Sequence, residues 1–122
     1  MAKVSIVGTG FVGRAWAISF ARAGHEATLW DKEPSAPAAA LAYIEGLLPD
    51  LAEHDLLNGS SPAEIRARMH VAATLDEALA GTEHVQENTP EDVAATVLFL
   101  VSEAGRNVSG QSIGVDGNVE SL

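Results

Sequence analysis

The clearest chemical pattern of the chain lies next to its N-terminus. Residues 3–13 read K-V-S-I-V-G-T-G-F-V-G, a short apolar run followed by glycines spaced Gly-x-Gly-x-x-Gly. The β-branched run predicts a buried strand, and the periodicity from Phe11 to Ala23 predicts a helix directly behind the glycines. A glycine-rich turn between strand and helix is typical of dinucleotide-binding sites, because backbone amides at the helix N-terminus can hold a diphosphate.

Each glycine of this triplet has its own expected task. Gly8 allows a tight turn, Gly10 lets the backbone approach a diphosphate, and Gly13 lets the helix pack closely on the strand. Ordinary turns also use glycine, so a purely structural turn is the alternative. The expected coenzyme-binding loop consists of Gly8, Thr9, Gly10, Phe11, Val12 and Gly13.

An acidic residue follows at the distance that the dinucleotide fingerprint requires. Asp31 ends the apolar run 27–30 and lies eighteen residues beyond Gly13. We expect its carboxylate to accept hydrogen bonds from an adenosine ribose, the alternative being a solvated side chain. A carboxylate would repel a 2′-phosphate, so Asp31 favours NAD over NADP. The adjacent Lys32 weakens this preference slightly.

Composition limits the class of protein. The 122 residues suit one domain, and no apolar run is long enough to cross a bilayer. The chain enters a strand almost at once, so we expect no secretory signal and a cytoplasmic location. The net charge of −10 disfavours nucleic-acid and membrane partners, and the absence of cysteine excludes disulfides and thiol chemistry. The polar residues 53–55 would scatter around a helix, so we expect no metal site.

The remaining pattern alternates strands and helices. Strands are expected at 4–7, 27–30, 70–73, 83–88 and 112–115, and helices at 11–23, 37–48, 62–69, 74–80 and 90–104. Right-handed crossovers arrange them as a Rossmann-like, doubly wound α/β fold of residues 1–122, with a parallel sheet of order 3-2-1-4-5 and helices on both faces. Pro49 should end or kink the second helix. The first helix should face the sheet with Val12, Trp16, Phe20 and Ala23.

Four segments together carry a family resemblance: K-V-S-I-V-G-T-G-F-V-G-R-A-W-A, L-W-D, A-T-L-D-E-A-L-A-G and H-V-Q-E-N-T-P-E. Through them residues 1–91 resemble the NAD-binding domain of 3-hydroxyacyl-CoA dehydrogenases and of their L-gulonate 3-dehydrogenase (lambda-crystallin) relatives. The resemblance implies NAD as cofactor, with the pyrophosphate on the three glycines, the adenosine ribose on Asp31 and Glu91 near the nicotinamide ribose. A lysine that some relatives place five residues after this glutamate is Thr96 here.

A second resemblance begins where the first ends. Residues 90–117, from P-E-D-V-A-A-T to G-V-D-G, are similar to the C-terminal end of short-chain dehydrogenases. This resemblance implies that the helix 90–104 and the final strand pack against another subunit, and the broad apolar surface of that helix also indicates a homo-oligomer, a dimer in the simplest case. Both families can carry Pro-Glu at this point. We therefore interpret Pro90-Glu91 as the seam of a recombined or engineered chimera.

Neither resemblance supplies catalytic residues. The first family's lie beyond the seam, the second family's precede its terminal segment, and no lysine follows Tyr43 at the four-residue spacing. The leading hypothesis is therefore an NAD(H)-binding module with little or no catalysis. One alternative is an active NAD-dependent oxidoreductase on a hydroxyacid or hydroxyacyl-CoA substrate, with Glu87, His84 or a neighbouring subunit as acid or base. The other is a structural chimera that binds no ligand.

Overall fold

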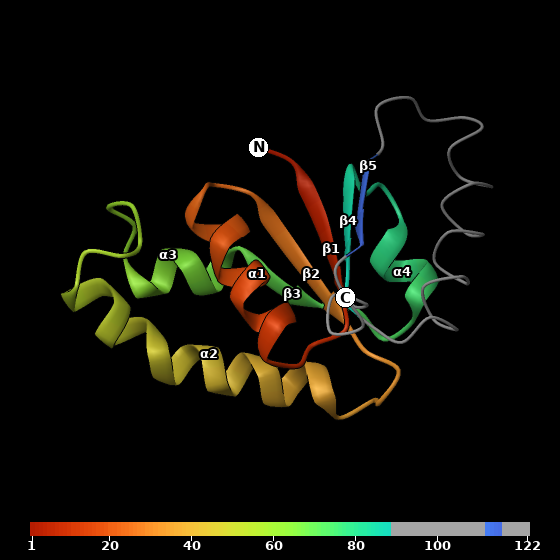
Figure 1. Ribbon diagram of the computed structural model, residues 1–122, viewed down its shortest axis with the longest axis horizontal. Helices are drawn as coiled ribbons and strands as arrows, with labels where there is room; N and C mark the ends of the chain where they lie inside the picture. Colours follow the sequence, from red (N-terminus) through yellow and green to blue (C-terminus); the bar gives the residue numbers. More distant parts are fainter. Residues whose placement is uncertain (89–111, 116–122) are drawn as a thin grey trace.

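A five-stranded parallel sheet forms the centre of the computed structural model, which describes residues 1–88 and 112–115 (Figure 1). Its strands are β1 Lys3–Val7, β2 Glu26–Trp30, β3 Met69–Val71, β4 His84–Glu87 and β5 Ser112–Val115, in the order β3-β2-β1-β4-β5. Val7 lies opposite Trp30 on one side and Glu87 on the other, so the carboxyl ends of the central strands meet at one edge. The predicted fold class and strand order are confirmed.

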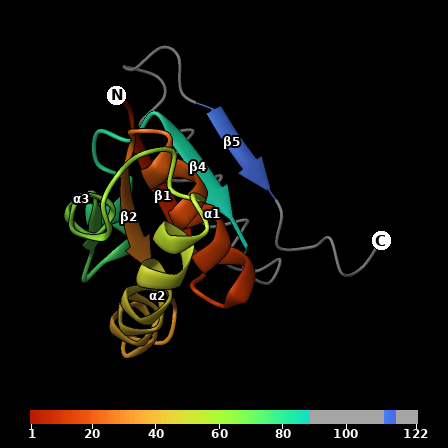
Figure 2. The ribbon, with the colours of Figure 1, turned by 90° about the vertical axis from the view of Figure 1, so that its left-hand side faces the viewer.

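Helices cover both faces of this sheet (Figures 1 and 2). One face carries α1 Phe11–Arg22, α2 Ala36–Glu53 and α3 Pro62–Ala67, and the other carries α4 Leu75–Leu79. The main core lies under the first three helices, and a smaller cluster that includes Val7, Leu79 and Val85 lies on the side of α4. The helix predicted at 90–104 lies outside the described residues.

The side of α1 that faces the sheet is made of small residues. Its buried members are Gly13, Ala17 and Ala21. Val12 is instead 53% exposed, and Trp16 stacks on Phe20 at the border of the core with a ring separation of 5.7 Å. Small side chains let the helix approach the strands closely, whereas large ones would hold it away. The predicted stripe is therefore wrong at Val12 and Ala23, which are exposed, whereas Trp16 and Phe20 pack at the edge of the core.

Helix α2 passes through Pro49 and ends four residues later, at Glu53. Its inward side includes the buried residues Leu41, Ile44 and Leu48. Proline removes one backbone donor, but Leu51 and Ala52 pack against the core beyond it. Packing on both sides of Pro49 therefore keeps the helix continuous, and the helix does not end at Pro49.

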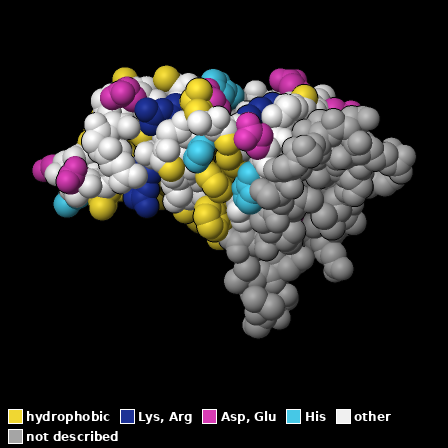
Figure 3. Space-filling model, turned by 90° about the horizontal axis from the view of Figure 1, so that it is seen from above, with side chains coloured by type: hydrophobic (Ala, Val, Ile, Leu, Met, Phe, Trp, Pro, Cys, Tyr) yellow, Lys and Arg dark blue, Asp and Glu magenta, His cyan; other side chains and the backbone are white. Residues whose placement is uncertain are grey.

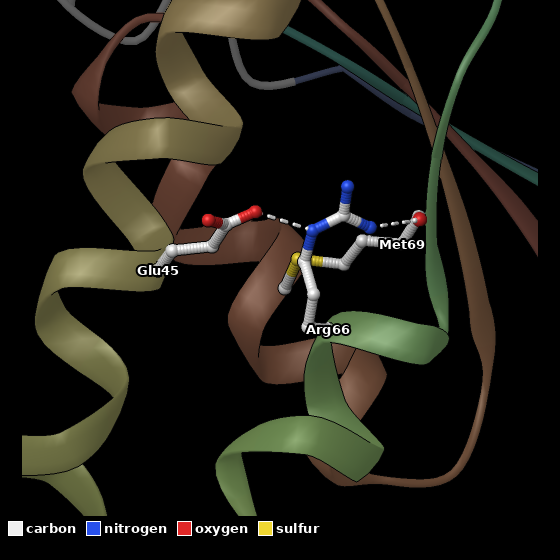
Figure 4. A network of polar contacts seen from close by, with 3 residues as sticks. All are labelled: Glu45, Arg66 and Met69. Carbon is white, nitrogen blue, oxygen red and sulfur yellow. Dashed lines mark hydrogen bonds and ion pairs between the residues drawn. The ribbon is translucent and has the colours of Figure 1, made fainter.

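Arg66 on α3 joins three elements (Figure 4). Its Nε donates a hydrogen bond to Glu45 Oε1 on α2 at 2.6 Å, and its Nη1 donates to the Met69 carbonyl at the start of β3 at 3.1 Å. A capping box opens α3, with Ser61 and Glu64 each donating a backbone N–H to the other's side chain. The N–H of Ser61 lowers the pKa of Glu64 below its ordinary value of 4.5.

The amino ends of the strands form the edge that Figure 3 shows from above. Charged and histidine side chains lie there among hydrophobic ones. The Ala2 N–H donates to His25 Nδ1 at 3.0 Å, and His70 Nε2 lies 2.6 Å from Glu26 Oε1. Within the described ranges, no helix is long and apolar enough to span a bilayer.

Candidate functional site

Two glycines shape the turn that leaves β1 at the carboxyl edge. Gly8 has a φ of 96°, a left-handed conformation, and its N–H donates to the Trp30 carbonyl at 2.9 Å. A Cβ on Gly13 would lie 1.9 Å from the Gly8 carbonyl oxygen. The backbone therefore shows the tight turn expected of Gly8 and the close packing expected of Gly13.

The N-terminus of α1 is open at this edge. Gly10 is the N-cap with a φ of −72°, no side chain caps the helix, and a Cβ on Gly10 would meet nothing within 4 Å. The N–H groups of Gly10, Phe11 and Val12 have no hydrogen-bond partner within the described part of the chain. Phe11 is 72% exposed. Unpaired amides and the positive end of the helix dipole make this loop suited to an anion.

Asp31 lies against the same loop from the end of β2. Its Oδ2 accepts hydrogen bonds from the Thr9 N–H at 2.7 Å and the Thr9 Oγ1 at 2.9 Å, and its Oδ1 accepts one from the Glu33 N–H at 2.9 Å. Thr9 is buried, and the adjacent Lys32 is exposed. The structure thus brings Asp31 and the glycine loop together. Glu91 lies outside the described residues.

A cavity of about 380 Å³ lies beyond the carboxyl ends of β2 and β3. Its lining residues are Trp30, Asp31, Pro34, Pro37, Val71, Ala72, Ala73 and Glu77. Most of these side chains are apolar, and Asp31 belongs both to the cavity wall and to the hydrogen bonds of the glycine loop. One elongated ligand can therefore reach from the cavity past Asp31 to the N-terminus of α1.

Asn88 holds the glycine turn from the side of β4. Its backbone N–H donates to the Val7 carbonyl at 2.8 Å, and its Nδ2 donates to the carbonyls of Val7 and Gly8 at 3.2 Å each. The sequence pattern indicates Asn88 only as part of the strand expected at 83–88. A polar residue directly after a central strand was the signal that could have identified it, because that position lies at the crevice.

Arg14 is a second residue at the loop that the sequence pattern does not single out. Its Nε donates to the Thr9 carbonyl at 3.0 Å, and its guanidinium lies 5.2 Å from the centre of the Phe11 ring and 4.9 Å from that of Tyr43. Its place directly after Gly13 put it in the first helical turn. The contact with Tyr43 joins two helices, which sequence spacing does not predict.

The two acid/base candidates lie at opposite ends of β4. His84 is opposite Val4 at the amino edge, whereas Glu87 is opposite Val7 at the carboxyl edge. Glu87 is 1% exposed. The geometry therefore removes His84 from the crevice and leaves Glu87 at its floor. In residues 1–88 and 112–115 no three carboxylate or imidazole groups gather as metal ligands.

Comparison with known proteins identifies the family of the chain. Residues 3–97 match the family described as 3-hydroxyacyl-CoA dehydrogenase, NAD binding domain. The chain is 37% identical over 89 residues to an L-carnitine dehydrogenase of Streptomyces griseus, covering 73% of this chain and 25% of that protein. It is 40% identical over 91 residues to lambda-crystallin of Oryctolagus cuniculus, covering 74% of this chain and 28% of that protein. The chain thus spans about a quarter of the length of these relatives.

Solved structures share the fold at lower identity. A diketoreductase superimposes with a TM-score of 0.78 at 20% identity, covering 97% of this chain and 42% of the other. The 3-hydroxybutyryl-CoA dehydrogenase of Escherichia coli gives a TM-score of 0.75 at 20% identity, covering 93% of this chain and 24% of the other. With the match over residues 3–97, the chain belongs to the NAD-binding domain family of 3-hydroxyacyl-CoA dehydrogenases, and its cofactor is NAD.

Proposed function

We propose that this domain binds NAD(H) across the carboxyl edge of the sheet. The backbone amides of Gly10, Phe11 and Val12 hold the diphosphate, and the Asp31 carboxylate accepts hydrogen bonds from the adenosine ribose. The observation that carries this proposal is the open N-terminus of α1, where these amides lack partners and a carboxylate lies beside the same loop. Gly8, Thr9 and Gly13 shape the loop without needing to touch the coenzyme.

The cavity beyond β2 and β3 is the site for the adenine. Its mostly apolar wall suits a flat purine, and Asp31 at its border lies where the attached ribose would follow. The Asp31 carboxylate disfavours a 2′-phosphate by charge repulsion, so the domain prefers NAD over NADP despite the neighbouring Lys32. Glu91 approaches the nicotinamide ribose, a role supported by the family resemblance alone.

The described residues supply little of what hydride transfer needs beyond the coenzyme. An acid or base must lie near the reacting carbonyl. Glu87 is the buried carboxyl at the crevice, and His84 lies at the other edge. The domain therefore acts as a coenzyme-binding module with little or no catalysis of its own. The alternative is an oxidoreductase on a hydroxyacid or hydroxyacyl-CoA substrate, favoured by the position of Glu87.

The junction near residues 90–91 belongs to the same proposal. The family match extends to residue 97, so it overlaps the segment similar to short-chain dehydrogenases over residues 90–97. A recombined or engineered chimera with this junction keeps the coenzyme site, because the glycine loop and Asp31 precede it. The domain is cytoplasmic and forms a dimer through residues 90–104 and β5. Light scattering after size-exclusion chromatography tests the dimer, and a monomer at high concentration would contradict it.

Titration of NADH fluorescence with the protein tests the binding proposal. We expect enhanced emission with the native chain, a much weaker response with Asp31→Ala, and a native response with Asp50→Ala. Asp50 is a matched control because it is an exposed aspartate on α2, away from the glycine loop. Repeating the titration with NADPH should give weaker binding that Asp31→Ala relieves. No enhancement with the native chain would favour the structural chimera that binds no ligand.

A separate assay addresses catalysis. The protein is incubated with NAD and a panel of 3-hydroxyacids and 3-hydroxyacyl-CoA compounds, and NADH formation is followed by absorbance. We expect no rate above the blank. Steady turnover that Glu87→Gln abolishes while NADH binding persists would establish the oxidoreductase alternative instead.

A further inference from the structure

The peptide unit between Thr9 and Gly10 connects the glycine loop to an arginine. The Thr9 carbonyl and the Gly10 N–H belong to one rigid plane, so a group that holds the carbonyl also fixes the direction of the amide. Arg14 Nε donates to this carbonyl at 3.0 Å, while the Thr9 N–H and hydroxyl are held by Asp31. We infer that Arg14 is a positioning residue that directs the Gly10 amide at the coenzyme diphosphate; this inference rests on the proposed function.

Two aromatic rings hold Arg14 in this place. The guanidinium lies 5.2 Å from the Phe11 ring centre and 4.9 Å from the Tyr43 ring centre, and the two rings meet edge-to-face at 5.6 Å. Cation–π attraction and planar contact restrict a side chain that is otherwise flexible. Tyr43 belongs to α2, so the direction of the Gly10 amide depends on the packing of α2 against α1.

The shape of Arg14, and not only its charge, carries this role. The hydrogen bond to Thr9 uses the Nε–H, and the rings contact the guanidinium plane. A lysine keeps the positive charge, but it has no Nε–H to donate to the Thr9 carbonyl and no planar group to stack on the rings. Phe11 is 72% and Tyr43 44% exposed. The clamp that Phe11 and Tyr43 form around Arg14 therefore lies at the protein surface, and its residues can be altered without opening the core.

NADH titrations of Arg14 variants test the inference against a simple charge effect. We expect Arg14→Met and Arg14→Lys to raise the Kd for NADH alike, by about fivefold, as for the loss of one ordinary hydrogen bond. Arg22→Met removes the same charge from the same helix, where Arg22 bonds to the Leu56 carbonyl, and should bind as the native chain does. If Arg14→Lys binds NADH with the Kd of the native chain, the positive charge alone accounts for the effect of Arg14 on binding. That result would overturn the inference.

A double-mutant cycle with Tyr43 tests the clamp. Tyr43→Phe keeps the ring and should bind NADH normally, whereas Tyr43→Leu should weaken binding, and adding Tyr43→Leu to Arg14→Met should weaken it no further. A merely structural pair would change the Tm of these variants with the Kd unchanged, and that result would overturn the inference.

Amide resonances measured without coenzyme separate this inference from the proposed function. In ¹H–¹⁵N spectra of the free protein, Arg14→Met should move the Gly10 amide resonance and Arg22→Met should not. If the native chain binds no NADH, the binding proposal and the inference built on it both fail. If the native chain binds NADH but Arg14→Met leaves the Kd and the Gly10 resonance unchanged, only the inference fails.

Discussion

Asp31 Oδ2 accepts two hydrogen bonds from Thr9, one from its backbone N–H at 2.7 Å and one from its hydroxyl at 2.9 Å. The acid that directly follows β2 therefore holds the glycine loop. Hydrogen bonds to a charged acceptor are stronger than those between neutral groups. Asp31 thus has two tasks in our proposal, to fix the loop and to accept the adenosine ribose.

Thr9→Val separates these two tasks of Asp31. Valine keeps the shape and the backbone N–H but removes the hydroxyl donor, so we expect a loss of about 1–2 kcal/mol in the free energy of unfolding. NADH binding should weaken less than in Asp31→Ala, where we expect a Kd at least about tenfold higher. Urea unfolding and NADH titration measure the two effects. Equal loss of NADH affinity in both variants would contradict the division of tasks.

Gly10→Ala and Gly13→Ala should differ strongly in their effect on stability. A Cβ at Gly10 meets open space, so Gly10→Ala should change the free energy of unfolding by less than about 1 kcal/mol. It should still raise the Kd for NADH, because the added methyl group occupies the space that we propose for the diphosphate. At Gly13 the Cβ would lie 1.9 Å from a backbone oxygen, so Gly13→Ala should cost at least about 2 kcal/mol. Thermal unfolding distinguishes them, and equal melting temperatures would contradict this expectation.

Neighbouring residues of α2 should differ strongly in their effect on folding. Ile44 is fully buried, and Ile44→Ala should cost about 2–5 kcal/mol through the cavity it leaves. Glu45 pairs with Arg66, but the two side chains are 52% and 41% exposed, so Glu45→Ala should cost less than about 1 kcal/mol. Urea denaturation of both variants checks the ranking. A larger loss for Glu45→Ala would show that the contact in Figure 4 matters more than its exposure suggests.

The capping box of α3 gives a pH dependence of known sign. The pKa of Glu64 in the folded protein lies below its ordinary value of 4.5, mainly because the Ser61 N–H binds the carboxylate. Its contribution to stability is therefore present above the unfolded pKa and is lost as the pH falls through the folded pKa. Compared with Glu64→Gln, the native chain should lose stability more steeply below pH 4.5. Parallel unfolding curves of the two proteins over that range would contradict this prediction.

The features that local chemistry determines could be predicted from the sequence. Glycine at positions 8 and 13 has few alternatives in a strand-to-helix turn, and the capping residues Ser61 and Glu64 mark a helix start by themselves. The order of the strands then followed from right-handed crossovers, because each expected strand was followed by a helix. These predictions depend on neighbours in sequence or on general rules of chain connection.

The predictions that failed depended on packing between distant segments. Trp16 is more hydrophobic than Ala17, yet Ala17 faces the sheet because the strands approach α1 closely there. The contacts of Asp31 with Thr9 and of Arg14 with Tyr43 likewise join separate elements, and no periodicity encodes them. Pro49 stays inside a helix because the core holds the chain on both sides of it.

Titration of the ¹⁵N-labelled protein with NAD, followed in ¹H–¹⁵N spectra, tests the coenzyme site most directly. We predict that the amide resonances of Gly10, Phe11 and Val12 move with saturating behaviour, together with those around Asp31. Resonances of the amino edge, such as that of His84, should stay in place. Unchanged resonances at Gly10, Phe11 and Val12 under excess NAD would contradict the proposal that this loop holds the diphosphate.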